Sequence, residues 1–310
     1  MSVCFLKHVA LEIPEEDIEK AKRFYTDFGL QAVQRKSCLA FKCYDRRYDS
    51  VLLIPGAKRK RLHHVCMGTT SEGIDKIWSN ANRHDIPLID GSPTGSSEGF
   101  YMKSPDGVLF HIVEAEKEEP ILPEPPFLIN SPGQNGRINA QALPFKSTIP
   151  EVKPRSMGHI ALFSEDVDSN VEFLELILGM RLSDKSQDVV AFLHCQGGSE
   201  HHVIAFTKSH GPGFHHCSFL VGSPDEVGLG GRRMIEKGND YGWGFGRHAI
   251  GSNFFHYIRD PWGSYAEYYC DMDYITNTEQ WTPKNWPLED ATHSWGPNPP
   301  DEFINNFEVD

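Results

Sequence analysis

The chain has 310 residues, 39% of them hydrophobic and 24% charged, which is typical of a soluble globular protein large enough for two domains. Its net charge of −13 excludes nucleic acid and anionic membranes as main partners, since both bind basic surfaces. No apolar run approaches the roughly 20 residues that span a bilayer, and the first residues lack a secretion signal. The seven cysteines form no CxxC motif, which predicts a reducing cytoplasm, and the 15 histidines are a first indication of a metal.

Two segments, LKHVALEI at 6–13 and MGHIALFS at 157–164, share an alternating apolar pattern with one histidine near its start. Each precedes an acidic turn and an amphipathic helical pattern that stops at a glycine, Gly29 or Gly179. In the second of these helices, Ser169 and Glu172 have the spacing of a capping box. The pattern predicts a strand followed by a helix at the start of each half.

A histidine pair opens the next strand of each half, in LHHVCMG at 62–68 and FHHCSFL at 214–220. A helical stretch follows, which glycines weaken at 225–237, and then strands around the tight turns PDG and PWG. The order of strand, helix and about three strands therefore recurs four times. The repeats cover residues 5–57, 60–115, 156–208 and 213–270.

The repeats predict an α+β fold with two domains, each made of two βαβββ modules. The N-terminal domain would span residues 1–115 and the C-terminal domain residues 156–270, joined by a linker at 116–155 that is rich in proline and acid. Residues 271–310 hold three tryptophans and many prolines, so we expect a strap that packs back on the body.

Three side chains of the second half form a candidate metal site. His159 and His216 lie on the first strands of their modules, and Glu267 lies on a closing strand between apolar residues. A lone histidine on a strand is more often a hydrogen-bonded polar residue than a ligand. A buried carboxylate, however, costs several kcal/mol unless a cation pairs with it. Two imidazoles and one carboxylate at equivalent repeat positions favour a mononuclear non-haem Fe(II) site with open positions for substrate and O₂.

The stretches GPGFHHCSFLV at 211–221 and GFGRHAIGSNFFHYIRDPWGSYAEYY at 244–269 resemble the signature of type I extradiol ring-cleavage dioxygenases of the vicinal oxygen chelate superfamily. The resemblance is strongest over residues 156–270. It implies the vicinal oxygen chelate fold, with Fe(II), or Mn(II) as the alternative, bound by His159, His216 and Glu267 in the C-terminal domain. By the same resemblance the second histidine of the pair is the ligand, and His215, which alternation directs to the other face, gives structural support.

The resemblance also assigns three catalytic residues. His202 matches an acid–base histidine beside the oxygen site, and His248 and Tyr257 match residues that hydrogen-bond the substrate or the bound oxygen. The implied reaction is extradiol cleavage of a catechol by O₂, giving a muconic semialdehyde type of product in aromatic catabolism. Family members often form homo-oligomers, which we expect here as well.

An apolar ring pocket is predicted from aromatic side chains in the same region, namely Trp243, Phe245 and Phe254, with the tail tryptophans Trp281, Trp286 and Trp295. The arginine that carboxylate-binding relatives carry near this stretch has no counterpart in YGWGFGRH. We therefore expect a neutral substituted, fused-ring or trihydroxylated catechol as the substrate.

The first half carries histidines at all three matching ligand positions, His8, His64 and His111, and Tyr101 falls opposite Tyr257. Serines, however, stand in place of the two catalytic histidines, Ser50 for His202 and Ser92 for His248. Three histidines could bind Zn(II). The sequence favours the alternative, in which these histidines are hydrogen-bonded remnants, so we expect this half to be catalytically silent and at most to carry an adventitious metal.

Two other functions are compatible with this scaffold. A glyoxalase-type isomerase or epimerase needs a divalent metal but no oxygen, and a non-enzymatic protein could bind a small aromatic molecule. Neither requires His202, His248 and Tyr257 together.

Overall fold

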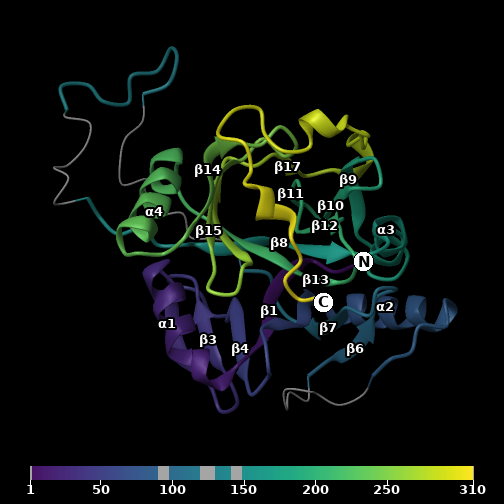
Figure 1. Ribbon diagram of the computed structural model, residues 1–310. Coiled ribbons are helices and arrows are strands. Elements are labelled where there is room, and N and C mark those ends of the chain that lie inside the picture. Colours follow the sequence, from purple (N-terminus) through teal and green to yellow (C-terminus); the bar gives the residue numbers. More distant parts are fainter. Residues whose placement is uncertain (1, 90–97, 119–129, 141–148, 310) are drawn as a thin grey trace.

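Two large mixed β-sheets and four α-helices form the body of the fold in the described part of the chain (Figure 1). The computed structural model describes residues 2–89, 98–118, 130–140 and 149–309. The first sheet has seven strands in the order β2-β3-β4-β1-β5-β7-β6. Its half of the chain contains β1 (Phe5–Ile13), α1 (Ile18–Asp27), β2 (Gln31–Gln34), β3 (Leu39–Lys42), β4 (Val51–Pro55), β5 (Arg61–Thr69), α2 (Ser71–Arg83), β6 (Phe100–Lys103) and β7 (Leu109–Glu114).

The second sheet has eight strands in the order β14-β15-β16-β13-β8-β12-β10-β9. A separate two-stranded sheet pairs β11 with β17. This half contains β8 (Ser156–Ser164), α3 (Val167–Leu176), β9 (Arg181–Ser186), β10 (Val190–His194), β11 (Ser199–Glu200), β12 (Ile204–Lys208), β13 (Gly213–Leu220), α4 (Pro224–Glu236), β14 (Tyr241–Arg247), β15 (Phe254–Arg259), β16 (Tyr265–Cys270) and β17 (Tyr274–Ile275).

Both sheets are built in the same way. In each, the first strands of two modules pair antiparallel at the centre, β1 with β5 and β8 with β13. Each of these strands also pairs in parallel with the closing strand of its own module. In the described part of the second module, two strands follow α2, and Ile89 bridges to Tyr101 in place of a third. The predicted α+β fold of repeated βαβββ modules is confirmed.

Helices α3 and α4 differ from expectation in their details. The side chain of Asp166 caps α3 by accepting from the Ser169 amide at 3.0 Å, so the predicted capping box of Ser169 and Glu172 is wrong. Helix α4 forms in spite of its glycines. A Cβ atom at Gly230 or Gly231 would lie within 3 Å of the Tyr268 or His256 ring, so glycine is what lets α4 approach the sheet.

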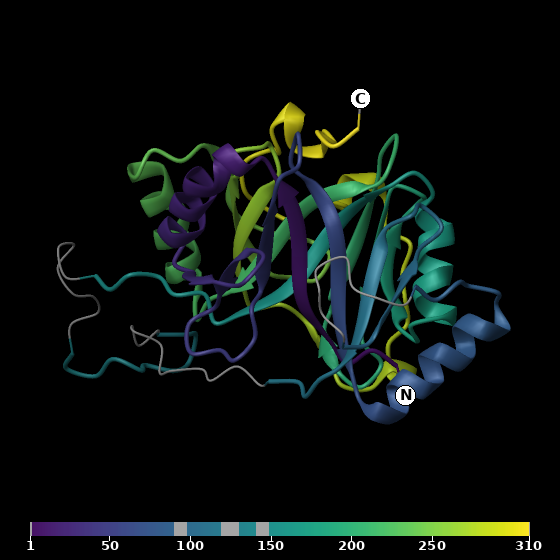
Figure 2. The same cartoon turned by 90° about the horizontal axis from the view of Figure 1, so that it is seen from below.

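The two halves pack with the helices in pairs, α1 beside α4 and α2 beside α3, as Figures 1 and 2 both show. Lys237 after α4 forms an ion pair with Asp27 of α1, and Asn80 of α2 donates to the Ile177 carbonyl after α3. Between the sheets, the Phe28 ring stacks on Tyr268 with centroids 3.8 Å apart. None of the helices in the described part of the chain is both long and apolar enough to cross a membrane.

Residues 271–309, here called the strap, run back over the second half and appear in yellow in Figure 1. The Trp243 indole donates to the Pro297 carbonyl at 2.7 Å, and Asn306 donates to the Gly211 carbonyl at 2.9 Å. The strap contains three short 3₁₀ helices, η3 (Thr278–Gln280), η4 (Leu288–Asp290) and η5 (Asp301–Ile304).

A buried ion pair fixes the end of the strap to the first half. Lys60 Nζ lies 2.7 Å from Glu308 Oε1, and the two side chains are 2% and 6% exposed. Replacing Lys60 with methionine leaves the Glu308 carboxylate buried without its cation, which costs about 3–5 kcal/mol. The strap can return that carboxylate to water by detaching. We therefore expect Lys60→Met to speed hydrogen exchange at the Asn305 amide, which donates to the Glu302 carbonyl within the strap. The exposed Lys58→Met serves as the control, and equal exchange in the two variants would show that the ion pair does not hold the strap.

Candidate metal centre and cavity

Strand register brings the three predicted ligands together. Ser218 of β13 is directly opposite His159 of β8 on one side and Glu267 of β16 on the other, and His216 lies two residues earlier on β13. All four side chains therefore share one face of the sheet. His159 Nε2 lies 3.2 Å and His216 Nε2 lies 3.7 Å from Glu267 Oε2. One donor atom from each of the three residues lies within 4.8 Å of the others.

The donor set fits a divalent cation. Two donors at about 2.1 Å from one ion lie roughly 3.0–3.4 Å apart at octahedral or tetrahedral angles, close to the observed separations. His216 Nε2 is buried without a hydrogen-bond partner, and the Glu267 side chain is fully buried. A buried carboxylate beside an unsatisfied ring nitrogen is an arrangement that a metal ion stabilises.

His215 and His216 have different roles. His215 Nε2 lies 2.9 Å from the Phe303 carbonyl of the strap, and His215 Nδ1 lies 2.6 Å from His216 Nδ1. A neutral His215 that donates from Nε2 can accept from His216 Nδ1, which leaves the lone pair on His216 Nε2. The first histidine of the pair thus orients the second toward the centre.

His202 lies beside the ligands, with its ring centroid 4.2 Å from that of His159. Its Nδ1 is 3.1 Å from Nδ1 of His201, whose Nε2 is 3.0 Å from the Asp184 carboxylate. His201 Nε2 donates to Asp184, so His201 Nδ1 accepts from His202 Nδ1, and His202 Nε2 is left as a base. Burial, with the neighbouring histidines, lowers the pKa of His202 well below its ordinary value, so the ring is neutral at neutral pH.

His248 and Tyr257 form a hydrogen-bonded pair next to Glu267 and His216. Tyr257 Oη lies 3.0 Å from His248 Nε2, and His248 Nδ1 donates to the Thr292 carbonyl of the strap. Burial raises the pKa of Tyr257 well above its ordinary value, and the nearby Glu267 raises it further. The phenol therefore stays protonated and donates its proton to His248 Nε2, which accepts because Nδ1 carries the proton of the neutral ring.

Two residues that the sequence did not single out hold Glu267. The Ser218 hydroxyl donates to Glu267 Oε2, and Asn253 Nδ2 donates to Oε1 at 3.4 Å. His201 and Asp184, behind His202, were missed as well. A third HH pair, at 201–202, is a sequence signal for His201, whereas Ser218, Asn253 and Asp184 become visible only through strand register and loop placement.

A cavity of about 160 Å³ opens onto the centre. Its walls come from the second sheet and from the strap, including Phe192, Trp243, Ile250, Thr292 and Phe303. Of the predicted pocket aromatics, Trp243 lines this cavity, whereas Phe245 and Phe254 lie outside it, stacked on one another and packed against Trp295.

The other two tail tryptophans also pack away from the cavity. Trp281 meets the His201 ring edge to face and donates to the Ser183 carbonyl, and Trp286 lies beside Lys284. The aliphatic and aromatic residues of the later strap, not its tryptophans, cover the site.

The first half brings the corresponding histidines together. His8 Nε2 lies 3.1 Å from His64 Nε2, and the Tyr101 ring stacks on His111 at 4.0 Å. Ser50 lies near Cys43, and Ser92, the predicted counterpart of His248, is outside the described residues.

Comparison with known proteins agrees with this architecture. The sequence matches the Glyoxalase/Bleomycin resistance protein/Dioxygenase superfamily over residues 6–112 and 156–268. It is 35% identical to "Metapyrocatechase 2" of Cupriavidus necator, over 98% of this chain and 92% of that protein. It is 24% identical to "Metapyrocatechase" of Geobacillus stearothermophilus, over 93% of this chain and 87% of that protein.

Solved structures share the fold. The Mn(II)-bound glyoxalase from Novosphingobium aromaticivorans superposes with a TM-score of 0.75 at 23% identity, over 97% of this chain and 94% of that one. The 2,2',3-trihydroxybiphenyl 1,2-dioxygenase from Sphingomonas wittichii strain RW1 gives 0.74 at 18% identity, over 96% and 100%. The repeated modules and the extent of the sequence match agree, and the chain belongs to the Glyoxalase/Bleomycin resistance protein/Dioxygenase superfamily.

Proposed function

We propose that this protein is an extradiol dioxygenase that cleaves the ring of a small catechol with O₂ at a mononuclear Fe(II) centre. The observation that carries the proposal is the convergence of His159, His216 and Glu267 at the wall of a cavity that also holds His202, His248 and Tyr257. The similarity to two metapyrocatechases supports an oxygenase.

The metal ligands of the proposal are His159, His216 and Glu267. A divalent ion bound by them would lower the pKa of the catechol hydroxyls and offer open positions to substrate and oxygen. Two imidazoles and one carboxylate suit Fe(II), with Mn(II) as the alternative that the names of two relatives mention.

The remaining polar residues of the cavity would manage protons. His202 Nε2, kept neutral by burial, is placed to accept a proton from a substrate hydroxyl and to return it later. The Tyr257 hydroxyl donates its one proton to His248 Nε2, so its oxygen can accept a hydrogen bond from a hydroxyl group of the bound substrate. The strap, through Thr292 and Phe303, keeps water from this space.

The cavity favours a neutral single-ring catechol. Its volume of about 160 Å³ is close to the roughly 150 Å³ of a protein cavity that holds benzene. No lysine or arginine is found among the described residues that line it, so a carboxylate substituent would have no cationic partner there.

Oxygen uptake tests the function. The protein loaded anaerobically with Fe(II) is mixed with catechol, methylcatechols, 2,3-dihydroxybiphenyl and a carboxylated catechol, with and without air. We expect equimolar oxygen consumption and a yellow ring-fission product, fastest with the single-ring neutral substrates. Turnover without oxygen would support a glyoxalase-type isomerase, and binding without turnover a carrier protein. Either result would contradict the proposal.

The expected compartment and assembly are parts of the same proposal. All seven cysteines are free thiols, five of them buried, which supports a reducing cytoplasm. We propose a homo-oligomer, which sedimentation velocity at micromolar concentration would test.

A further inference from the structure

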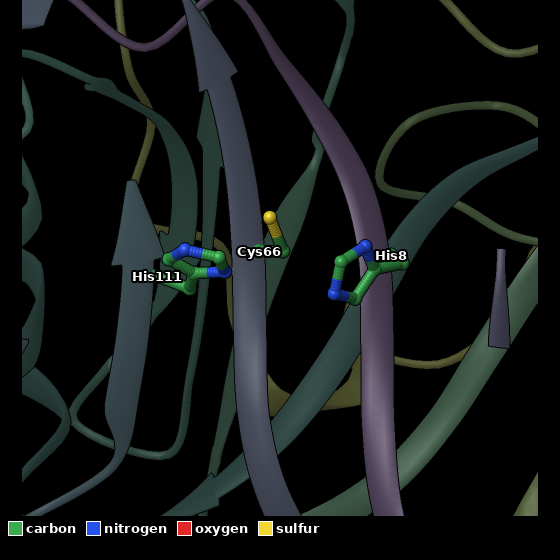
Figure 3. Close-up of side chains that lie close together, drawn as sticks. All are labelled: His8, Cys66 and His111. Carbon is green, nitrogen blue, oxygen red and sulfur yellow. The ribbon is translucent and has the colours of Figure 1, made fainter. Parts of the chain in front are cut away.

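A second cluster of metal-binding side chains lies on the first sheet, far from the proposed catalytic residues in the sequence. Cys66 of β5 is directly opposite His8 of β1 on one side and His111 of β7 on the other. The three side chains therefore point to the same face of the sheet, and Figure 3 shows the two imidazoles on either side of the thiol. One donor atom from each residue lies within 4.8 Å of the other two.

This cluster occupies the same register positions as the centre in the second half. His159, Ser218 and Glu267 stand in one row across β8, β13 and β16, as His8, Cys66 and His111 do across β1, β5 and β7. The two halves therefore share these three register positions, but Cys66 stands where the second half has Ser218, which bonds Glu267 and is not a metal donor, and His111 stands in place of the carboxylate.

An independent observation points to a ligand at this cluster. His111 is 3% exposed, and its Nε2 bonds the Glu98 carbonyl at 2.7 Å. Its other ring nitrogen, Nδ1, is buried without any hydrogen-bond partner. With Nε2 donating to the carbonyl, Nδ1 carries the free lone pair, which is the state of a metal-binding histidine whose other nitrogen is fixed by a carbonyl. The Tyr101 ring, stacked on His111 at 4.0 Å, further fixes its orientation.

A fourth donor is near the cluster. His64 Nε2 lies 3.1 Å from His8 Nε2, close to the roughly 3.3 Å that separates two nitrogens bound to one tetrahedral ion. His63 Nδ1 lies 2.7 Å from His64 Nδ1, which repeats the paired arrangement that orients His216 in the second half. His64 thus lies beside His8 at the edge of the cluster, outside the group of three donor atoms that are within 4.8 Å of one another.

The donor types select the metal. Thiolate and imidazole together suit tetrahedral Zn(II), whereas the carboxylate of the second half suits Fe(II) or Mn(II). The matching position for the catalytic base holds Ser50, next to Cys43, so no proton carrier stands there. His64, Cys66 and His111 are buried.

We infer that the first half binds one structural Zn(II) ion through His8, Cys66 and His111, with His64 as the fourth donor. Binding converts the Cys66 thiol to a thiolate, and the released proton goes to solvent. The ion ties β1, β5 and β7 together at the middle of the first sheet. It takes no part in ring cleavage.

Cobalt substitution separates the two metal sites, because only this one contains sulfur. The full-length protein is freed of metal with a chelator and titrated with Co(II) while the near-ultraviolet sulfur-to-cobalt charge-transfer absorption is recorded. We expect the absorption to saturate at one Co(II) per chain at this site and to be removed by excess Zn(II). Cys66→Ser should abolish it, whereas Cys195→Ser, a change at a buried thiol outside the cluster, should retain it.

Metal analysis of the protein as purified complements the titration. Wild-type protein and Glu267→Ala should both retain about one zinc per chain after dialysis, and Cys66→Ser should lose it. The wild-type titration needs no variant, so it decides the case even where Cys66→Ser folds poorly. Absence of the charge-transfer absorption in metal-loaded wild-type protein, or its persistence in Cys66→Ser, would overturn the inference.

Discussion

Glu267→Ala is expected to lose the metal of the second half and all ring cleavage with it. Loss of residues that only support a ligand lowers metal affinity about 10- to 100-fold, so loss of the one anionic ligand should exceed 100-fold. The variant leaves two neutral imidazoles to face a divalent cation, and it leaves the donors of Ser218 and Asn253 without their acceptor. Iron and manganese in the dialysed protein, measured by mass spectrometry, check this result.

Glu200→Gln is the matched control for that variant. The Glu200 carboxylate accepts from the Tyr269 hydroxyl, and the Tyr269 ring lies 5.0 Å from His159, so the control changes a carboxylate near the centre that is no ligand. We expect its metal content to match that of the wild type. Wild-type iron affinity in Glu267→Ala would remove this residue from the ligand set and the proposed mechanism with it.

His202→Phe is expected to lower kcat by a factor of about 10²–10⁴ while the iron content stays unchanged, since that is the usual contribution of a general acid–base group. The phenyl ring keeps the contacts with Phe192 and His159 but has no nitrogen to carry the proton. Single-turnover measurements with the Fe(II)-loaded variant, together with metal analysis, check both parts.

His256→Phe makes the same chemical change outside the cavity. His256 is 8% exposed and lies on β15 against Gly231 of α4. The kcat of the His256→Phe variant should therefore equal that of the wild type. Loss of iron from His202→Phe would identify His202 as a ligand instead. Unchanged kcat would show that the proton is carried by another group.

The fold could be predicted because its signal repeats. Each half contains one alternating strand with a single histidine and one strand with a histidine pair. The pattern in one half therefore supports the assignment of the same module in the other half. Features that depend on partners distant in sequence could not be predicted. The helix expected at 225–237 is present as α4, but its pattern was weakened by glycines, and only the structure shows that Gly230 and Gly231 allow its close approach to Tyr268 and His256.

The three candidate metal ligands could be selected from the sequence for a similar reason, whereas the residues next to them could not. Histidine on a strand is conspicuous, but Ser218 and Cys66 are ordinary residues until register places them between two ligands. The pocket aromatics show the limit of composition: Phe245 and Phe254 have the right chemistry, yet they pack against Trp295 instead of the cavity.

The Phe303 carbonyl of the strap meets His215, and His215 in turn fixes His216. Docking of the carboxyl-terminal segment on the second half is thereby thermodynamically coupled to metal affinity at the proposed centre. If a bound ion favours the docked state of this segment by some factor, docking of the segment raises the affinity for the ion by the same factor, because linkage is reciprocal. A chain clipped before Phe303 should thus release a metal ion bound at the proposed centre more readily, although the three proposed ligands are still present.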